Sequence, residues 1–412
     1  MAETKRVTVI GGGSSGMMAA ISAARSGARV MLLERRDRVG KKLLVTGNGR
    51  CNLSNSVCAL SSFHGGDPVF IDTVLSLFPA ASAINFFAEL GIVCKVEGEG
   101  RIYPHSGQAS AVLDVMRWEM ERLHVDVRTG HEVIKIRKNG SGFALALHAG
   151  GELPAGRLVL AAGGMAGPQF GSDGSGLRLA AALGHRLVDP VAALVPLRLR
   201  ADFPRKLKGV SFAGRGEVRC GEEVLRSEAG EFLFTDSGIS GIPVLQLSRV
   251  ASTALKKQHP VQVVLDLFPD SNPDELNSAL ETRFQRQSGK NLADALVGLL
   301  NKRLIPVVLS EAGITDHAQP ATLLSAANRT ALAGLLKNWS FSVSGTMPWP
   351  EAQVTAGGIA LDQVDPATLE SRLVPGLYFC GEVLDVDGDC GGFNLQWAWS
   401  SGYVAGQHAA AF

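Results

Sequence analysis

The segment that most constrains the fold is GGGSSG at residues 11–16. A short β-branched run, Arg6–Ile10, precedes it, and the Ala- and Met-rich run Met17–Ser26 follows with the composition of a helix. A second apolar run, Arg29–Glu34, has the length of a strand. Strand, glycine turn, helix and strand in this order predict a βαβ unit.

The glycines of the turn have GxGxxG spacing, and each has its own task. Gly11 permits the tight turn, Gly13 lets a pyrophosphate approach the backbone, and Gly16 allows close helix packing. Glu34 ends the second strand, where it can accept hydrogen bonds from ribose hydroxyls. The strand, the glycine turn, the helix and Glu34 follow one another at the spacing of a dinucleotide-binding unit. The turn therefore predicts a dinucleotide site, which also includes Ser15.

Both FAD and NAD bind to such a turn, and the C-terminal segment favours FAD. GLYFCGEVLDVDGDCGGFNLQWAWSSG places an apolar strand before Gly381-Glu382, acids after it, and two glycines before a helix that begins near Asn394. In two-part flavin domains the chain returns here to the flavin, where a helix N-terminus stabilises the anionic reduced form. The FAD contacts expected from this segment are Gly381, Glu382, Asp385, Gly391, Gly392, Phe393 and Asn394.

The region between these segments changes character twice. From about Pro190, short strands alternate with glycine turns, which favours a small antiparallel barrel, and helical periodicity follows. The predicted boundaries are 1–190 and 353–412 for the two parts of the FAD-binding domain, 191–265 and 338–352 for the barrel-like insert, and 266–337 for the helical insert. Other expected elements are a buried strand at Arg157–Ala162, a hairpin of Val133–Arg137 and Phe143–Leu147, and helices at Ala80–Leu90, Ala109–Leu123, Asn272–Arg286, Asn291–Leu300 and Ala321–Trp339.

The chain resembles the YhiN/BaiN-like (aminoacetone-oxidase-like) family of FAD-binding flavoproteins. Nearly the full length carries the resemblance, through GKKLLVTGNGRCNLSN at residues 40–55, LVLAAGG, GEFLFTDSGISGIPVLQLS, VTAGGIALD and GGFNLQWAWSSGYVAG. It implies an α/β fold: a glutathione-reductase-like (Rossmann-type) FAD domain interrupted by a small antiparallel β-barrel and a helical insert.

The resemblance also implies a second wall of the FAD site. Val133 meets the adenine through its backbone, and Ala162-Gly163 forms a turn beside the cofactor. Residues of the loop at 40–55 that lie along FAD are Lys42, Thr46, Gly47, Asn48, Arg50, Cys51 and Asn52. The chain departs from the family pattern at Ala161-Ala162-Gly163, which lacks the usual threonine, at Asp236-Ser-Gly238, where the family has His-x-Gly, and at Ile242, where it has proline. These departures concern the substrate more than the fold.

The cations of the loop have two interpretations. Lys41, Lys42 and Arg50 are solvated surface charges, or Lys42 and Arg50 neutralise the pyrophosphate or hold the flavin O2/N1 region. Their place in a glycine-rich loop favours the second. Residues 1–60 hold ten Lys/Arg against three Asp/Glu, and residues 351–412 hold one against eight. Most such charge runs are solvated surface, and the alternative is that this basic and this acidic segment meet around one site.

Tyr103, His105 and Cys51 are the candidate catalytic residues. His titrates near neutrality, although a structural role for His105 competes equally with a catalytic one. Cys51 and Cys58 are separated by six residues, where flavin disulfide reductases have four, and a packed thiol is favoured for Cys51. Asp385, Asp387 and Asp389 alternate like calcium ligands, but the other ligands of such a loop are missing, so no metal is expected.

The composition limits the classes of partner and the compartment expected for the protein. A net charge of +1 indicates neither nucleic acid nor membrane, and no apolar run reaches the roughly 18 residues of a membrane span. Six cysteines without a CxxC motif, and no apolar leader, predict a reduced, cytoplasmic protein. Residues 196–350 hold 18 Lys/Arg against 15 Asp/Glu, which is weak for an RNA surface.

Together these features predict a FAD-dependent oxidoreductase that moves a hydride through flavin N5 to or from a C=C or C=N bond of a small molecule. There is no second GxGxxG unit, so NADH or NADPH is expected as a transient reductant. The resemblance leaves open reduction of a steroid-like enone, amine oxidation, and reduction of a uridine in ribosomal RNA to dihydrouridine. A hypothesis from another class is a non-catalytic flavin protein that binds RNA or senses redox state. The oligomeric state is left open.

Overall fold

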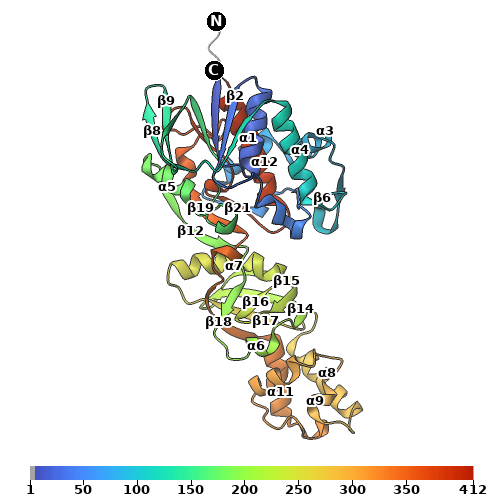
Figure 1. Cartoon of the computed structure of the whole chain (residues 1–412). Helices are drawn as coiled ribbons and strands as arrows, with labels where there is room; N and C mark the ends of the chain where they lie inside the picture. The colour runs from blue at the N-terminus through green and yellow to red at the C-terminus, as the bar shows by residue number, and fades with distance from the viewer. Residues whose placement is uncertain (1–4, 412) are drawn as a thin grey trace. The chain divides into compact units, whose positions relative to one another are not determined.

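The computed structural model describes residues 5–411, which divide into two units (Figure 1). The first unit contains the residues up to Ala192 and those from Trp349 onward, and the second runs from Ala193 to Pro348. The first unit is therefore assembled from two distant parts of the chain.

A five-stranded parallel sheet forms the centre of the first unit, in the order β20-β11-β1-β2-β7. Ile10 of β1 lies opposite both Leu160 and Leu33. β1, β11 and β20 are buried apart from their first arginines, Arg6 and Arg157, and most of their residues are Val, Leu, Ile or Phe, as expected for a parallel sheet covered on both faces. The bounds are β1 (Arg6–Ile10), β2 (Arg29–Glu34), β7 (Asp126–Thr129), β11 (Arg157–Leu160) and β20 (Leu377–Phe379).

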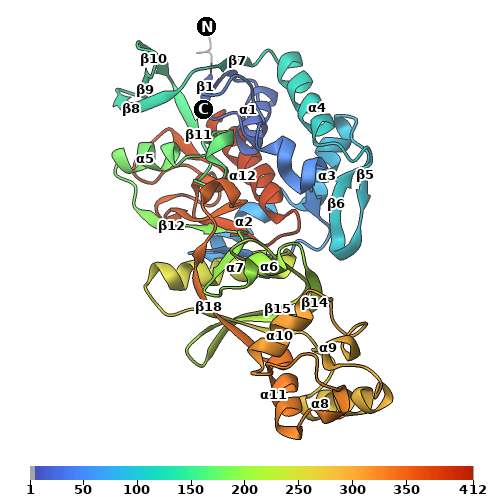
Figure 2. The ribbon, with the colours of Figure 1, turned by 60° about the horizontal axis from the view of Figure 1, so that its bottom comes forward.

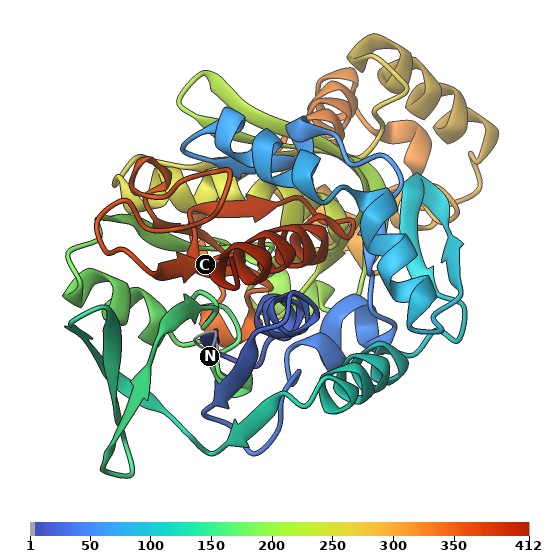
Figure 3. The same cartoon turned by 90° about the horizontal axis from the view of Figure 1, so that it is seen from above.

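Two helices from distant parts of the chain, α1 (Ser14–Arg25) and α12 (Phe393–Ala409), pack with their backbones in close approach (Figure 3). A Cβ atom on Gly402 would lie 2.4 Å from the Ser15 carbonyl oxygen, and one on Gly406 would lie 2.2 Å from that of Ala19. Only glycine permits this separation. The contact holds the C-terminal segment beside the N-terminal glycine turn.

Smaller sheets and helices complete the first unit. The strands β8, β9 and β10 form an antiparallel sheet (Figure 2), which confirms the predicted hairpin. The other sheets are β3-β6-β5, β12-β19 and β21-β4. The bounds are β3 (Ser54–Asn55), β4 (Phe63–Gly65), β5 (Cys94–Val96), β6 (Arg101–Pro104), β8 (Val133–Asn139), β9 (Gly142–Leu147), β10 (Glu152–Ala155), β12 (Leu187–Ala193), β19 (Val354–Ile359), β21 (Val386–Gly388), α2 (Pro68–Leu77), α3 (Ala80–Glu89), α4 (Ala109–Arg122) and α5 (Ser175–Ala182).

One stretch of the described residues, Pro68–Glu89, is long and apolar enough to cross a membrane, with a mean hydropathy of 1.5. Pro79 separates it into α2 and α3, and Phe70, Ile71 and Val74 of α2 are buried in the core. Core helices pass the same test of length and composition, so the stretch is weak support for a membrane span.

The second unit contains a closed six-stranded antiparallel barrel, as predicted from the alternating strands and glycine turns. Its core is continuous with that of the helical residues, because Phe232, Phe234 and Trp339 of the barrel belong to one buried cluster with Leu280 and Leu332. The bounds are β13 (Leu197–Leu199), β14 (Ser211–Cys220), β15 (Glu223–Phe234), β16 (Gly238–Ser240), β17 (Gln262–Asp266), β18 (Trp339–Thr346), α6 (Pro204–Leu207), α7 (Ile242–Lys256), α8 (Pro273–Arg286), α9 (Leu292–Ala295), α10 (Leu304–Glu311) and α11 (Ala326–Lys337).

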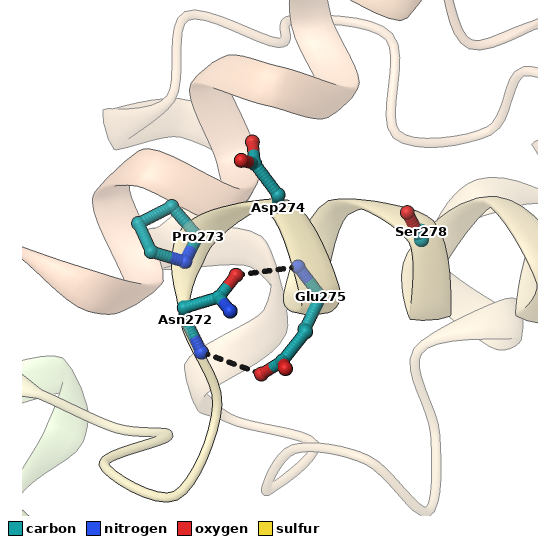
Figure 4. Close-up of a pocket in the computed structure, with 5 residues that line it drawn as sticks. All are labelled: Asn272, Pro273, Asp274, Glu275 and Ser278. Carbon is teal, nitrogen blue, oxygen red and sulfur yellow. Dashed lines mark hydrogen bonds between the residues drawn. The ribbon is translucent and has the colours of Figure 1, made fainter.

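The start of α8 confirms the helix predicted from Asn272 onward. Asn272 accepts a hydrogen bond from the Glu275 N–H at 2.9 Å, and the Glu275 carboxylate accepts one from the Asn272 N–H at 2.9 Å (Figure 4). This capping box, with Pro273 in the first turn, satisfies donors that the helix leaves unpaired.

Other predicted helices of this unit are wrong in extent. The residues at 291–300 form only the four-residue α9, because Gly298 takes a left-handed φ of +86°. The helix predicted at 321–339 begins after the Ser325 cap, and Trp339 already belongs to β18. The helix α7 was missed, because its first residues follow the glycine turn that ends at Gly241.

Replacing Gly406 by alanine is predicted to lower the free energy of unfolding by about 1–3 kcal/mol, because the new methyl group overlaps the Ala19 carbonyl. The matched control is Gly334→Ala in α11, where nothing lies within 4 Å and the lost glycine entropy should stabilise by about 0.5–1 kcal/mol. Thermal unfolding of both variants measures the contrast. Equal midpoints would contradict the role assigned to the helix contact.

His185 makes the stability of the first unit dependent on pH. Its buried ring donates from Nδ1 to the Ala180 carbonyl at 3.1 Å and accepts at Nε2 from the Ser371 hydroxyl at 2.7 Å. Burial lowers the pKa of His185 below its ordinary 6.5, against a smaller opposing effect of the Ala180 bond.

Unfolding exposes His185, so below pH 6.5 the unfolded chain binds a proton that the folded chain does not. We predict that the free energy of unfolding falls as pH drops through this window. Denaturant titrations at pH 7.5 and 5.5 measure the loss, which His185→Gln should reduce. An unchanged loss in the variant would assign the pH dependence to other groups.

Candidate functional site

The glycine turn between β1 and α1 has the geometry of a phosphate cradle. Gly11 has a φ of +106°, and a Cβ there would lie 2.4 Å from the Ala161 carbonyl oxygen. A Cβ on Gly16 would lie 1.9 Å from the Gly11 oxygen, so both positions require glycine. A Cβ on Gly13, the N-cap residue of α1, would meet nothing within 4 Å. The space in front of the helix terminus is therefore open to an anion.

Glu34 closes this cradle from the end of β2. One carboxylate oxygen accepts from the Gly12 N–H and the other from the Arg36 N–H, both at 2.7 Å. Nearby, Arg36 Nε and Ser172 Oγ are buried without a hydrogen-bond partner among residues 5–411. Ser172 Oγ lies 2.9 Å from a Cβ built on Gly163. Unpaired buried polar atoms beside an open cradle fit a polar nucleotide.

Val133 begins β8, and Ala162-Gly163 lies just beyond β11 of the parallel sheet. The N–H of His131, two residues before Val133, donates to the Glu34 carbonyl at 2.9 Å, and Val133 itself is buried. Ala162-Gly163 directly follows the end of β11, and Gly163 has a φ of +72°. Their contacts with adenine and cofactor remain predictions.

Ser15 connects the glycine turn with the C-terminal segment. A Cβ on Gly381 would lie 2.3 Å from Ser15 Oγ. The Gly381 N–H donates to Ser401 Oγ at 2.9 Å, and its carbonyl accepts from Trp397 Nε1 at 3.1 Å. Gly381 is therefore held between the first turn of α1 and the side chains of α12.

Lys42 and Glu382 join the basic and acidic segments. Lys42 Nζ lies 2.8 Å from one Glu382 carboxylate oxygen, and the other accepts from the Thr355 N–H at 2.8 Å. Thr355 Oγ1 in turn accepts from the N–H groups of Met165 and Ala166. The alternative in which the two segments meet is confirmed at this ion pair, and Thr355 is a site residue that sequence reasoning missed.

The loop GKKLLVTGNGRCNLSN contains an unusual backbone. Gly47, Asn48 and Gly49 have successive φ values of +55°, +55° and +81°, and Cys51 has +60°. The Cys51 N–H donates to the Thr46 carbonyl at 3.0 Å, which closes the loop. Cysteine pays steric strain in this conformation, and such strain concentrates at ligand sites.

Arg50 is held on the ring of Tyr103. Its guanidinium carbon lies 4.1 Å from the ring centroid, and one nitrogen lies 2.5 Å from the Glu97 carboxylate. Lys95 contacts the same carboxylate at 3.1 Å, while Tyr103 lies 3.2 Å from a Cβ built on Gly47. Arg50 and Lys42 thus both have carboxylate partners within the chain, and their contact with the cofactor stays a prediction.

The candidate catalytic residues differ in their surroundings. Tyr103 is buried against the loop, whereas His105 is exposed, and its imidazole has no hydrogen-bond partner among residues 5–411. Burial raises the pKa of the Cys51 thiol to about 12, so it stays protonated. None of the six cysteines forms a disulfide, and burial raises the pKa of Cys58 to about 11. In the described part of the chain, no three His, Cys, Asp or Glu side chains form a metal-ligand group.

The start of α12 contacts the loop at residues 40–55. Gly392, its N-cap residue, has a φ of +99°, and a Cβ there would lie 2.3 Å from the Ser54 carbonyl oxygen. The Asn52 amide oxygen accepts from the Gly392 N–H at 3.1 Å. Asn394 Oδ1 accepts from the Gly388 N–H at 2.8 Å. Buried residues among the other predicted contacts here are Asp385, Gly391 and Phe393.

Gln396 is a further residue that sequence reasoning missed. Its buried amide accepts from Ser54 Oγ at 2.6 Å and donates to the Phe78 carbonyl at 3.2 Å and to Ser400 Oγ at 2.9 Å. Trp399 Nε1 donates to the Leu53 carbonyl at 2.9 Å. The letters LQWAWSS look like an ordinary helix, so only the tertiary structure shows that they anchor the loop.

A Rossmann-type sheet with this cradle, a strained glycine loop and a helix N-terminus at the same site defines a FAD-dependent oxidoreductase. Residues 5–408 match the family described as "HI0933-like protein Rossmann domain". The chain belongs to the HI0933-like family, which confirms the resemblance seen in the sequence and the expected FAD cofactor.

Similar proteins include two curated relatives and one solved structure. The 3-dehydro-bile acid delta(4,6)-reductase of Clostridium scindens is 41% identical, with 98% of this chain and 99% of the relative covered. The ribosomal RNA dihydrouridine synthase of Escherichia coli is 31% identical, with 98% and 97% covered. The structure of 3-ketosteroid-delta4-(5alpha)-dehydrogenase from Rhodococcus jostii is 15% identical with a TM-score of 0.49, covering 100% of this chain and 98% of that one.

Gly13→Asn is predicted to weaken FAD binding about tenfold or more, because its side chain fills the open space of the cradle. Asparagine is a favourable N-cap residue, so the stability of the apoprotein should change by only a few tenths of a kcal/mol. Titration with FAD followed by fluorescence, and thermal unfolding without FAD, measure the two effects.

The matched control is Gly16→Ala, whose methyl group overlaps the Gly11 carbonyl. It should lower the stability of the apoprotein itself. Normal FAD affinity in Gly13→Asn would refute the placement of the pyrophosphate.

Proposed function

We propose that this protein is a FAD-dependent reductase that takes hydride equivalents from NADH or NADPH and transfers them to an activated C=C bond of a small molecule. Its 41% identity over 98% of the chain with a 3-dehydro-bile acid delta(4,6)-reductase carries the proposal. A double bond conjugated with a ketone accepts hydride readily, because the ketone oxygen takes the negative charge. The candidate substrate class is therefore unsaturated 3-oxo bile acids and related enones.

FAD, when bound, supplies reversible hydride transfer at flavin N5. In this proposal Gly13 and the first turn of α1 hold the pyrophosphate, and Glu34 binds the ribose hydroxyls. The N-terminus of α12, capped by Gly392, stabilises negative charge on the pyrimidine. The Lys42–Glu382 pair fixes the loop against the C-terminal segment, and Arg50 orients Tyr103.

Reduction of a uridine in ribosomal RNA is the second candidate, favoured by the 31% identity with a ribosomal RNA dihydrouridine synthase. The excess of only three positive charges in residues 196–350 (18 minus 15) supports the small molecule over RNA. Six cysteines that form no disulfide support the expectation of a reducing, cytoplasmic compartment.

Anaerobic stopped-flow spectroscopy of the FAD-loaded protein tests the proposal. NADH or NADPH should bleach the flavin band near roughly 450 nm. A 3-oxo bile acid with a C4–C5 double bond should then restore the colour, whereas the saturated 3-oxo bile acid should not. Reoxidation by a ribosomal RNA fragment alone would favour the second candidate. A flavin that neither nicotinamide bleaches would remove the reductase proposal, and oxygen uptake with amine alone would indicate an oxidase.

A further inference from the structure

His64 and Asp389 form a dyad that sequence reasoning did not single out. His64 Nε2 lies 2.8 Å from an Asp389 carboxylate oxygen, and both side chains are partly accessible, at 23% and 15%. His64 lies in β4 and Asp389 directly follows β21, its antiparallel partner. The Asp389 N–H donates to the Ser62 carbonyl at 2.9 Å, so the backbone holds the carboxylate in place.

Hydrogen bonds hold the dyad beside the N-terminus of α12, which the proposed function places at the flavin. Asp389 stands three positions before Gly392, the N-cap residue of α12. Asn394, in the first turn, donates to the carbonyls of Gly388 and Asp389 at 2.7 and 3.3 Å. Phe63, beside His64, packs edge-on against Phe393 with ring centroids 5.7 Å apart.

The surroundings suit a proton donor. Asp389 engages Nε2, and Nδ1 has no hydrogen-bond partner among residues 5–411. Three acids lie near the dyad: Asp387 directly opposite in the strand pair, Asp385 with a carboxylate oxygen 3.2 Å from a Cβ built on Gly66, and Asp67 at the start of α2. The Arg101 cation acts on Cys390, the residue after Asp389. A carboxylate that orients one ring nitrogen leaves the other to exchange protons.

We propose that His64 is the general acid of the reduction and that Asp389 is its positioning residue, an inference that rests on the proposed function. Reduced FAD, when bound, would supply the hydride for the β-carbon of the enone, and the π electrons of the double bond would then move toward the α-carbon. The Nδ1 proton of His64 forms the second C–H bond there, which leaves a neutral imidazole that water reprotonates. The substrate gains two electrons, the flavin loses two, and reduced nicotinamide replaces them.

A first experiment needs no substrate. In ¹⁵N-histidine-labelled holoprotein, the ring resonances of His64, assigned with His64→Gln, should move when dithionite reduces the flavin. The resonances of His148, exposed in the turn between β9 and β10, should stay in place. Unmoved His64 resonances would overturn the proposal, because a proton donor at the flavin must sense its added charge.

A second experiment separates proton donation from hydride supply. In stopped flow, His64→Gln should slow reoxidation by the unsaturated 3-oxo bile acid about a hundredfold or more, while flavin reduction by nicotinamide is unchanged. Asp389→Asn should slow the same step less and displace its pH profile, and His148→Gln should match the wild type. Reoxidation of a flavin-loaded His64→Gln variant at the wild-type rate would refute the role of His64.

The two experiments distinguish this inference from the proposed function. If the wild-type flavin is not reoxidised by the enone, the proposed function fails, while the resonances still decide whether His64 lies at the flavin. If the wild type turns over and His64→Gln does so equally, only the role of His64 fails. Flavin absorbance of each variant verifies that the protein is folded and loaded.

Discussion

The first unit depends on the close approach of two helices that lie far apart in the sequence. Gly402 and Gly406 of α12 bring the backbone of that helix against Ser15 and Ala19 of α1. Side chains larger than a hydrogen would separate the helices, and Gly381 would lose its contact with Ser15. The residues that start and end the cofactor site are therefore neighbours only while this contact persists.

Hydrogen bonds and an ion pair between polar groups then fix how the loop at residues 40–55 and the C-terminal segment lie against each other, which packing alone does not determine. Glu382 forms an ion pair with Lys42 and accepts a hydrogen bond from the Thr355 N–H. Gln396 accepts a hydrogen bond from the hydroxyl of Ser54, in the loop at residues 40–55. Because buried polar groups are costly unless paired, these bonds select one arrangement of loop and helix. The left-handed residues of the loop, including Cys51, are held by this frame.

Much of the fold could be predicted because its signals are local. The parallel strands, the glycine turn and the hairpin follow from period, composition and spacing within short windows. The short α9 and the missed α7 show where this fails. The helix predicted at 291–300 ran through the left-handed Gly298, whereas the turn signal at Gly241 hid the start of α7. Of the site, the glycines and Glu34 were accessible from spacing, whereas Thr355 and Gln396 have no local pattern.

By itself, the sequence determined that a βαβ unit with a dinucleotide-type glycine turn begins the fold, and it predicted that the C-terminal glycines belong to the flavin site, because these tasks need particular residues at particular spacings. Only the tertiary structure decided the partners: Arg50 with Glu97, Lys42 with Glu382, and His64 with Asp389. The two members of the His64 pair are 325 residues apart. Such pairings depend on which strands and helices meet in space, and that is settled by the burial of the whole core.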